Sequence, residues 1–397
     1  MIYILIGVFA LYSVYKAFLS ILQIKFISQN ATKKAVVLSQ EDYEKAAIIA
    51  IKNEKFSLAS NIFSFILLVF WSLCGANLLQ NLFNDGLFGN TIFCVAFLVI
   101  NSLFHIPFEI YERFVKDKKF GFSTITPKLF VIDLFKSLAL IVIFGGIFIY
   151  LLLWIFESLG EFWWIWGFCF AFCMILLINL IYPTLIAPIF NKMTPLNDEN
   201  LTNSINSLLE SCGFKSSGVF VMDASKRDNR LNAYFGGLGS TKRVVLFDTL
   251  IKKLTQNEIL AVLGHELGHF KHKDLLKNIV LMGVVLFVVF FVLGNIPSSF
   301  YTALNLKENG GALIVFFLLY SPVLSAIFEP LISAFSRSHE FGADKFGADN
   351  TNKNDMILAL KKLGSENKAF PISHKIYSFV YHSHPSLFER INELENS

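Results

Sequence analysis

Residues 278–304 (NIVLMGVVLFVVFFVLGNIPSSFYTAL) are predominantly apolar, and stretches of this kind decide the class of the protein. A helix needs about 20 mostly apolar residues to cross the hydrocarbon of a bilayer. Six further stretches of this character are 2–22, 59–82, 91–111, 133–156, 163–187 and 311–334. Only 16% of the 397 residues are charged, whereas soluble domains carry about a quarter. We therefore predict an all-α, multispanning membrane protein with seven transmembrane helices.

Two polar stretches separate or follow these spans. Residues 190–277 lie between the fifth and sixth spans, and residues 336–397 end the sequence. Both are too long for simple loops, so we expect them to fold outside the hydrocarbon. The predicted division is 1–189 with five transmembrane helices, 190–277 as a folded polar segment, 278–335 with helices six and seven, and 336–397 as a C-terminal segment.

The distribution of Lys and Arg predicts the orientation. Residues 21–58 carry six of them and residues 113–128 carry five, whereas 83–90 and 157–162 carry none. Because cytoplasmic loops are enriched in Lys and Arg, this asymmetry places the N-terminus outside and both polar segments in the cytoplasm.

Several polar side chains lie within the predicted spans, where each is costly unless it faces protein or water. The first predicted span, near the N-terminus, is apolar apart from a few polar residues and one lysine within residues 1–24. Asp133 and Lys136 lie near a span end, where snorkelling to the interface would expose their charges. Asn101 and His105 are deeper and one helical turn apart. They indicate either a hydrophilic internal cavity or hydrogen bonds between helices.

Composition argues against two other kinds of site. The net charge is only +4, and no basic patch is interleaved with aromatic residues, so we expect no nucleic-acid partner. The five cysteines include no CxxC pair, and four of them lie in apolar stretches. We interpret them as small buried hydrophobes rather than as a disulfide framework or metal ligands.

The stretch just before the sixth span carries chemistry. Thr255 followed by Glu258 forms the pattern of a capping box, which predicts a helix start. On that helix His265 and His269 are four residues apart, so both imidazoles project from one side. This spacing allows two nitrogens to bind one zinc ion at about 2.0–2.1 Å.

Glu266 completes the H-E-x-x-H pattern. Beside the first histidine, it could take a proton from the attacking water and pass it to the leaving amine. We expect Gly268 to leave room beside the metal. The alternative is a chance match, which the capped helix and its place before a span disfavour.

A catalytic zinc ion keeps three protein ligands and one open position. Glu340 is the leading candidate for the third ligand, and Asp344, four residues later, could accept a hydrogen bond from a ligand histidine. We place both on a helix that follows the seventh span. His339 and His272 are rival ligands, and an ordinary exposed acidic face is the alternative.

A cluster near the end of the sequence, residues 382–390, contains His384 and Arg390. Such side chains near a cleaved amide can stabilise the developing oxyanion. Composition alone favours a surface turn before a helix at this position.

Two short stretches of the polar segment predict β-strands. Residues 244–247 (VVLF) follow residues 232–235 (NAYF), and the glycines of 236–239 predict a turn between two strands. An edge strand beside the histidine helix could pair with an extended peptide. The alternative is a small sheet that only supports that helix.

These features, taken in order, resemble the type I CAAX prenyl endopeptidases, integral-membrane zinc proteases that remove the last three residues from prenylated proteins. The matching segments are 183–192 (PTLIAPIFNK), 232–235 (NAYF), 245–250 (VLFDTL), 265–269 (HELGH), Ser336-Arg337 with Glu340 and Asp344, and His384-Pro385 with Glu389-Arg390. Six separated matches in one order are far more specific than one zinc motif.

The resemblance implies seven spans around a large internal chamber and a small α+β, gluzincin-like zinc peptidase domain. It implies one zinc ion on the cytoplasmic side, with Glu340 as third ligand and Asp344 supporting a ligand histidine. It places His384 and Arg390 near the scissile carbonyl, and Asn232 and Ala233 along the bound peptide.

We therefore predict a zinc metalloendopeptidase that cleaves near the C-terminus of prenylated or other membrane-associated peptides, with membrane lipid as a further partner. One alternative is a broader quality-control protease of membrane proteins without a prenyl requirement. Another is a lipid-binding or transport protein with a vestigial zinc site, which an intact Glu266 disfavours. The Phe- and Lys-rich composition predicts a bacterial inner membrane.

Overall fold

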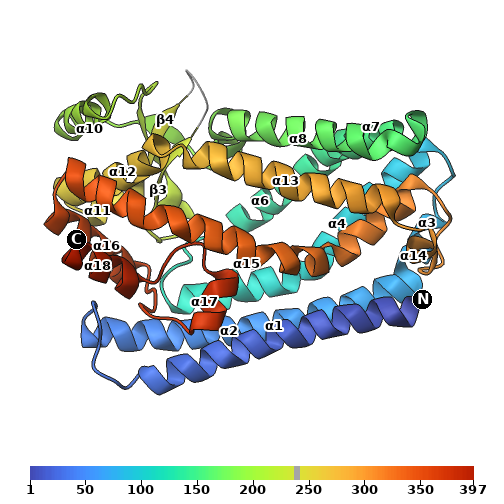
Figure 1. Cartoon of the computed structure of the whole chain (residues 1–397), viewed down its shortest axis with the longest axis horizontal. Coiled ribbons are helices and arrows are strands. Elements are labelled where there is room, and N and C mark those ends of the chain that lie inside the picture. Colours follow the sequence, from blue (N-terminus) through green and yellow to red (C-terminus); the bar gives the residue numbers. More distant parts are fainter. Residues whose placement is uncertain (237–241) are drawn as a thin grey trace.

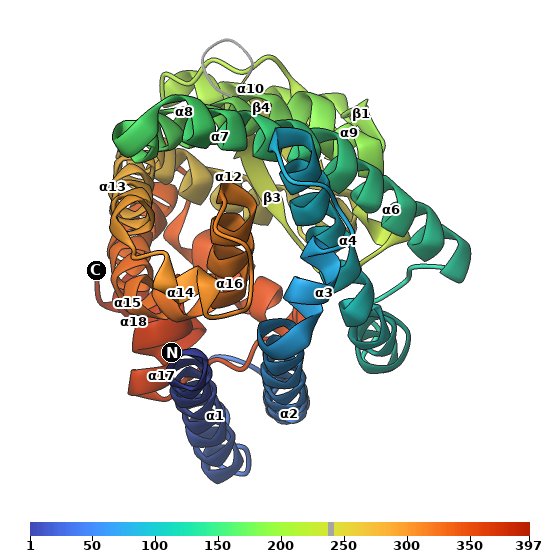
Figure 2. The same ribbon diagram turned by 90° about the vertical axis from the view of Figure 1, so that its right-hand side faces the viewer.

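The computed structural model describes residues 1–236 and 242–397. Seven helical segments are long and apolar enough to cross a membrane, which confirms the predicted number. Their bounds are Ile2–Asn30, Gln40–Gln80, Leu87–Lys119, Pro127–Ser158, Gly160–Phe190, Asp274–Asn295 and Gly310–Asn350. They run along the long axis of the molecule, and the β-strands lie at one end (Figure 1). Seen end-on, the spans form an open ring (Figure 2).

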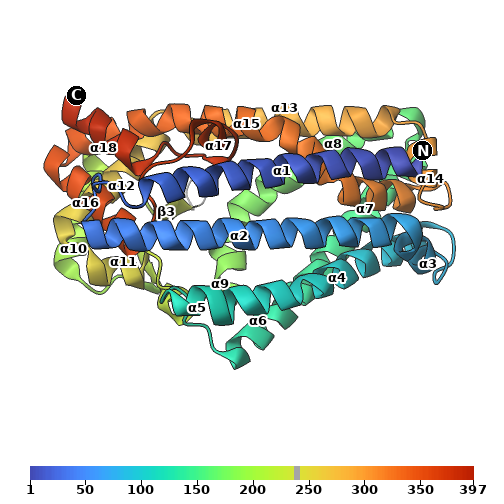
Figure 3. The ribbon, with the colours of Figure 1, turned by 90° about the horizontal axis from the view of Figure 1, so that it is seen from below.

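Four of the seven segments contain π-helical turns, which join consecutive α-helices. The elements of the membrane part are α1 (Ile2–Asn30), α2 (Gln40–Phe70), η1 (Trp71–Gly75), α3 (Ala76–Gln80), α4 (Leu87–Tyr111), η2 (Glu112–Lys116), α5 (Asp117–Lys119), α6 (Pro127–Leu140), η3 (Ile141–Gly145), α7 (Gly146–Ser158), η4 (Gly160–Phe162), α8 (Trp163–Ile181), η5 (Tyr182–Ile186), α9 (Ala187–Phe190), α13 (Asp274–Asn295), α14 (Ser299–Thr302) and α15 (Gly310–Asn350). Helices α1 and α2 lie side by side along the molecule (Figure 3).

The sixth span differs from the predicted range 278–304. Helix α13 begins at Asp274, directly after Lys273, whose positive φ of 58° breaks the preceding helix. It ends at Asn295. Pro297 follows, and a proline cannot continue the backbone ladder of a helix. The prediction extended too far because the residues beyond the proline are also largely apolar.

The seventh span is longer than expected. Helix α15 is a single helix of 41 residues, which makes it about 62 Å long at 1.5 Å per residue. A bilayer core is only about 30 Å thick. The separate helix predicted to carry Glu340 and Asp344 is therefore the far end of the spanning helix, and one continuous helix carries both side chains.

The polar segments form an α+β unit. Its elements are β1 (Met193–Pro195), α10 (Glu199–Ser211), β2 (Val219–Met222), η6 (Ala224–Lys226), β3 (Ala233–Gly236), β4 (Arg243–Phe247), α11 (Asp248–Lys253), α12 (Gln256–Lys271), α16 (Lys353–Glu366), α17 (Lys375–Tyr381) and α18 (Leu387–Asn396). The strands have the order β1-β2-β4-β3. The predicted pairing of β3 with β4 is confirmed and antiparallel. The turn predicted between them falls largely on residues 237–241, which lie outside the described residues.

Small residues bring helices α12 and α15 into close contact. A Cβ atom added to Gly268 would lie 2.8 Å from Cα of Ala343, and one added to Gly264 would lie 3.1 Å from Cα of Gly347. Such small-residue contacts let helix backbones approach closely. The expectation that Gly268 leaves room beside the metal is therefore wrong, because Gly268 faces the neighbouring helix.

Two polar residues predicted to snorkel have protein partners instead. Asp133 of α6 accepts two hydrogen bonds from Arg227, at 2.7 and 2.9 Å, which ties this span to the α+β unit. Lys136 donates to the carbonyl of Ile189 at 2.7 Å. Deeper in the spans, Trp71 Nε1 donates to Asn101 at 3.2 Å, so Asn101 makes a hydrogen bond between helices.

Candidate metal centre

Three side chains that can ligate a metal converge where α12 meets α15. The ligating atoms of His265, His269 and Glu340 all lie within 4.8 Å of one another. Nε2 of His265 lies 3.2 Å from Nε2 of His269. The Glu340 carboxylate oxygens lie 3.7 Å and 3.4 Å from these two nitrogens respectively. Residues 75 positions apart in sequence thus meet at one point.

These distances fit a tetrahedral metal. A tetrahedron with bonds of 2.0–2.1 Å has edges of about 3.3 Å. Oε2 of Glu340 is buried without a well-oriented hydrogen bond among the described residues, although Nδ1 of His384 lies 2.7 Å away. A buried carboxylate oxygen in that state is strongly disfavoured unless a cation meets it. Two imidazoles and one carboxylate form the donor set of several catalytic zinc sites.

The ring of His265 is oriented by a buried ion pair that contacts its Nδ1 atom. Nδ1 of His265 lies 2.8 Å from Oδ1 of Asp344, which is 1% exposed. Arg390 donates from Nε and Nη2 to the two oxygens of Asp344, at 2.8 and 2.6 Å. A carboxylate on Nδ1 orients the ring so that Nε2 faces the metal position.

The second histidine has a similar partner, which the sequence analysis missed. Nδ1 of His269 lies 3.1 Å from Oδ2 of Asp274, and Lys277 donates to Oδ1 of Asp274 at 2.8 Å. Asp274 is 3% exposed although it begins the spanning helix α13. In the sequence Asp274 is a single carboxylate five residues after His269. Helical spacing does not predict that the two side chains meet, because the helix breaks at Lys273 between them.

The electrostatics of the site favour a cation. Burial by itself would lower the pKa of His269, but hydrogen bonds to Glu340 and Asp274 raise it to about 9. Burial also disfavours the charged form of Arg390, yet its contact with Asp344 raises the pKa of the guanidinium. The carboxylates therefore stabilise positive charge at the position where a metal would sit.

A cavity of about 410 Å³ opens beside His265, the first of the three ligating residues. Its polar lining includes Glu266, Asn232 and Arg390, and most of its apolar lining consists of leucine, valine, methionine and alanine side chains. Ala233 also lines it and begins β3, one of the two edge strands of the described sheet. Oδ1 of Asn232 accepts the backbone N–H of Ala233 at 2.9 Å.

His384 and Arg390, the two side chains expected near a scissile carbonyl, differ in solvent exposure and in the partners that hold them. His384 lines the cavity and its side chain is 59% exposed. The side chain of Arg390 is 14% exposed and is engaged by Asp344. His384 is thus the freer group, whereas Arg390 acts mainly on Asp344.

The rival ligands lie elsewhere. His339 places Nε2 3.7 Å from Oδ1 of Asp274, the partner of His269. His272 packs edge-on against Phe346. The metal-binding group found among the described residues contains neither of them.

Comparison with known proteins gives a consistent match over the whole chain. Residues 23–192 match the family described as CAAX prenyl protease N-terminal, five membrane helices, and residues 195–397 match peptidase family M48. A CAAX prenyl protease 1 homolog of Dictyostelium discoideum is 37% identical over 76% of this chain and 72% of its own length. CAAX prenyl protease 1 of Saccharomyces cerevisiae is 34% identical over 75% of this chain and 70% of its own. The crystal structure of S. mikatae Ste24p superposes with a TM-score of 0.92 at 30% identity, covering 99% of this chain and 98% of that one.

Proposed function

This chain belongs to peptidase family M48, among the CAAX prenyl proteases 1, and is an integral-membrane metalloprotease; we propose that its metal is one zinc ion held by His265, His269 and Glu340. The observation that carries the proposal is the near-tetrahedral spacing of the three ligating groups, 3.2–3.7 Å. Zinc bound there would polarise the scissile carbonyl and lower the pKa of a water.

Glu266 is the proposed general base and acid. It is half-buried, follows the first ligand and lines the cavity. From there its carboxylate takes a proton from the attacking water and delivers it to the leaving amine. His384 is the proposed donor to the developing oxyanion, and Arg390 contributes by holding Asp344 and through it His265.

We propose that the substrate peptide binds as an extended strand along β3. Among the described residues that strand pairs with β4 on one side only, so its other edge can form main-chain hydrogen bonds with a peptide. Asn232 and Ala233 would align the peptide beside Glu266. The apolar part of the cavity lining suits the aliphatic residues of a CAAX sequence.

The relatives named above are CAAX prenyl proteases, and we propose a prenylated C-terminal peptide as the substrate. Two spans bury little of their apolar surface in the protein: 6% of the apolar window of α13 and 11% of that of the fifth span are buried. This supports the proposal that membrane lipid covers their outer surface; the large chamber among the helices is proposed from the resemblance. The division of the chain into four functional segments remains part of this proposal.

The proposed orientation puts the metal end in the cytoplasm. It rests on the basic loops 21–58 and 113–128, which lie towards the same end of the spans as the α+β unit. The relatives named above are eukaryotic, and they give no support to the bacterial inner membrane that the composition suggested.

Glu266→Gln tests the mechanism. We expect at least a 100-fold loss of peptide hydrolysis, since general acid–base catalysis contributes about 10²–10⁴-fold, while zinc content stays at the wild-type level. Glu210→Gln, on the exposed side of α10, is the matched control. Retained hydrolysis in Glu266→Gln would refute the assigned base.

The substrate proposal has its own test. Purified protein in detergent is given a farnesylated CAAX peptide, the same peptide without the prenyl group, and a misfolded membrane protein. We expect the first to be cleaved with the highest kcat/KM. Preferred cleavage of the misfolded protein would favour the quality-control alternative instead.

A further inference from the structure

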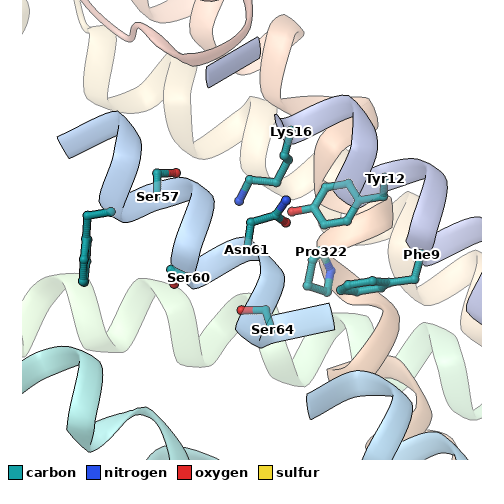
Figure 4. A pocket seen from close by; sticks show the side chains of 9 residues that line it. Phe9, Tyr12, Lys16, Ser57, Ser60, Asn61, Ser64 and Pro322 are labelled. Carbon is teal, nitrogen blue, oxygen red and sulfur yellow. The ribbon is translucent and has the colours of Figure 1, made fainter. Parts of the chain in front are cut away.

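A second cavity lies between α1, α2 and α15, away from the metal centre (Figure 4). Its volume is about 380 Å³, within the range of about 300–1,000 Å³ typical of small-ligand sites. The lining residues are Phe9, Tyr12 and Lys16 of α1, Phe56, Ser57, Ser60, Asn61 and Ser64 of α2, and Pro322 of α15. None of them contributes to the hydrolysis proposed above.

The polar groups of α2 in this cavity form one stripe. Ser57, Ser60, Asn61 and Ser64 are spaced i, i+3, i+4 and i+7, which places them on one face of the helix. Among the described residues, none of the three serine hydroxyls has a hydrogen-bond partner in the protein, whereas Asn61 donates to the carbonyl of Ser13 at 2.8 Å. Free hydroxyls beside a cavity in a membrane helix require water or a ligand.

Lys16 supplies a positive charge to the same cavity. No carboxylate in the described part of the chain lies within ion-pair distance of its ammonium, which lies 5.7 Å from the ring centroid of Tyr12. Figure 4 shows Lys16, Tyr12 and Asn61 pointing toward one another from α1 and α2. An ionisable residue inside a span is expensive and is by default a functional-site candidate.

The cavity lies toward the end of the spans that carries the metal centre. Phe56 of its lining is covered by the Lys116 ammonium at 5.0 Å, and Lys116 also donates to Asn53 at 2.8 Å. These polar groups mark where α2 leaves the apolar region. The end of the cavity at Phe56 and Ser57 therefore lies close to this polar level, which a lipid headgroup can reach, while Phe9, Ser64 and Pro322 extend the cavity into the apolar region.

We propose that this cavity binds the phosphate group of an anionic membrane lipid. Lys16 provides the charge, and the serine hydroxyls of α2 and the Tyr12 hydroxyl donate to phosphate oxygens. Phe9, Phe56 and Pro322 offer apolar walls to the lipid chains. Basic pockets between transmembrane helices near the membrane surface are established sites for anionic headgroups. Glu329, a neighbouring carboxylate of α15, does not line the cavity.

Native mass spectrometry of the full chain in detergent tests the proposal. The probes are dioleoylphosphatidic acid, dioleoylglycerol, which has the same chains without phosphate, and inorganic phosphate as competitor. We expect a phosphatidic acid adduct that dioleoylglycerol does not form and that equimolar inorganic phosphate does not displace. Complete displacement would overturn the lipid as the source of the phosphate.

Lys16→Met should weaken the phosphatidic acid adduct about fivefold, because one basic side chain near an anionic lipid is worth about 1 kcal/mol. Lys25→Met removes an exposed charge from the same helix and should leave the adduct unchanged. If Lys16→Met does not fold, Ser57→Ala/Ser60→Ala provides the second test and should also weaken the adduct. Equal adducts in wild type and the cavity variants, or an equal loss in Lys25→Met, would overturn the proposal.

Discussion

Each histidine at the metal position is held by an aspartate that is itself paired with a basic side chain, and we call each such pair the support of that histidine. The two supports use the same chemistry in different surroundings. Behind His265, Asp344 is paired with Arg390 in the interior, with side-chain exposures of 2% and 14%. Behind His269, Asp274 is equally buried at 4%, but its partner Lys277 is 46% exposed. In each case a histidine, an aspartate and a cation lie in series.

The difference lies in what else each support does. The Asp344–Arg390 pair joins α15 to α18, which are separate parts of the fold, whereas Asp274 and Lys277 are three residues apart on α13. Breaking a buried pair leaves an uncompensated charge in the interior, while an exposed partner is replaced by water. The first support therefore serves both metal binding and stability, and the second serves mainly metal binding.

Asp344→Ala gives the largest expected effect. It leaves Arg390 buried without its partner, which should lower the free energy of unfolding by about 3–5 kcal/mol, measured by denaturant unfolding in detergent. Asp344→Ala/Arg390→Met removes both charges and should recover much of that loss. A single variant as stable as wild type would contradict the structural role of this support.

Asp274→Asn should mainly affect the metal. Loss of a carboxylate behind a ligand histidine typically lowers metal affinity 10–100-fold, and chelator competition measures this. Unfolding with zinc in excess should remain close to wild type. Asp349→Asn, an exposed residue of α15, is the matched control. A large loss of stability in Asp274→Asn would mean that the two supports do not differ as described.

Lys277→Met should give the smallest effect. Half-exposed ion pairs contribute about 0–1 kcal/mol, so zinc affinity should fall less than about fivefold. Lys271→Met, an exposed residue of α12, should have no effect in the same chelator assay. A tenfold or greater loss in Lys277→Met would show that this exposed support depends on its cation as strongly as the buried one.

The sequence predicted the local features of the fold well. Seven spans, the capping box of Thr255 and Glu258 and the β3–β4 pair are all present. Each depends on residues close together in the chain: apolar length, helical spacing or strand pairing across a short connection. Residue spacing made Glu340 and Asp344 the leading candidates but left rival ligands open, and the family resemblance strengthened both. The role of His384 came mainly from the resemblance, because composition alone favoured a plain surface turn.

Other features were decided only by tertiary structure. The partner of Asp133, the close approach of Gly268 to Ala343 and the position of Asp274 all depend on how separate elements pack. No local pattern encodes the distance between α12 and the end of α15. The sequence by itself determined the number of membrane spans and which residues can carry zinc chemistry. The packing of α12 against one 41-residue helix decided that His265, His269 and Glu340 meet, and the break at Lys273 decided that Asp274 supports His269.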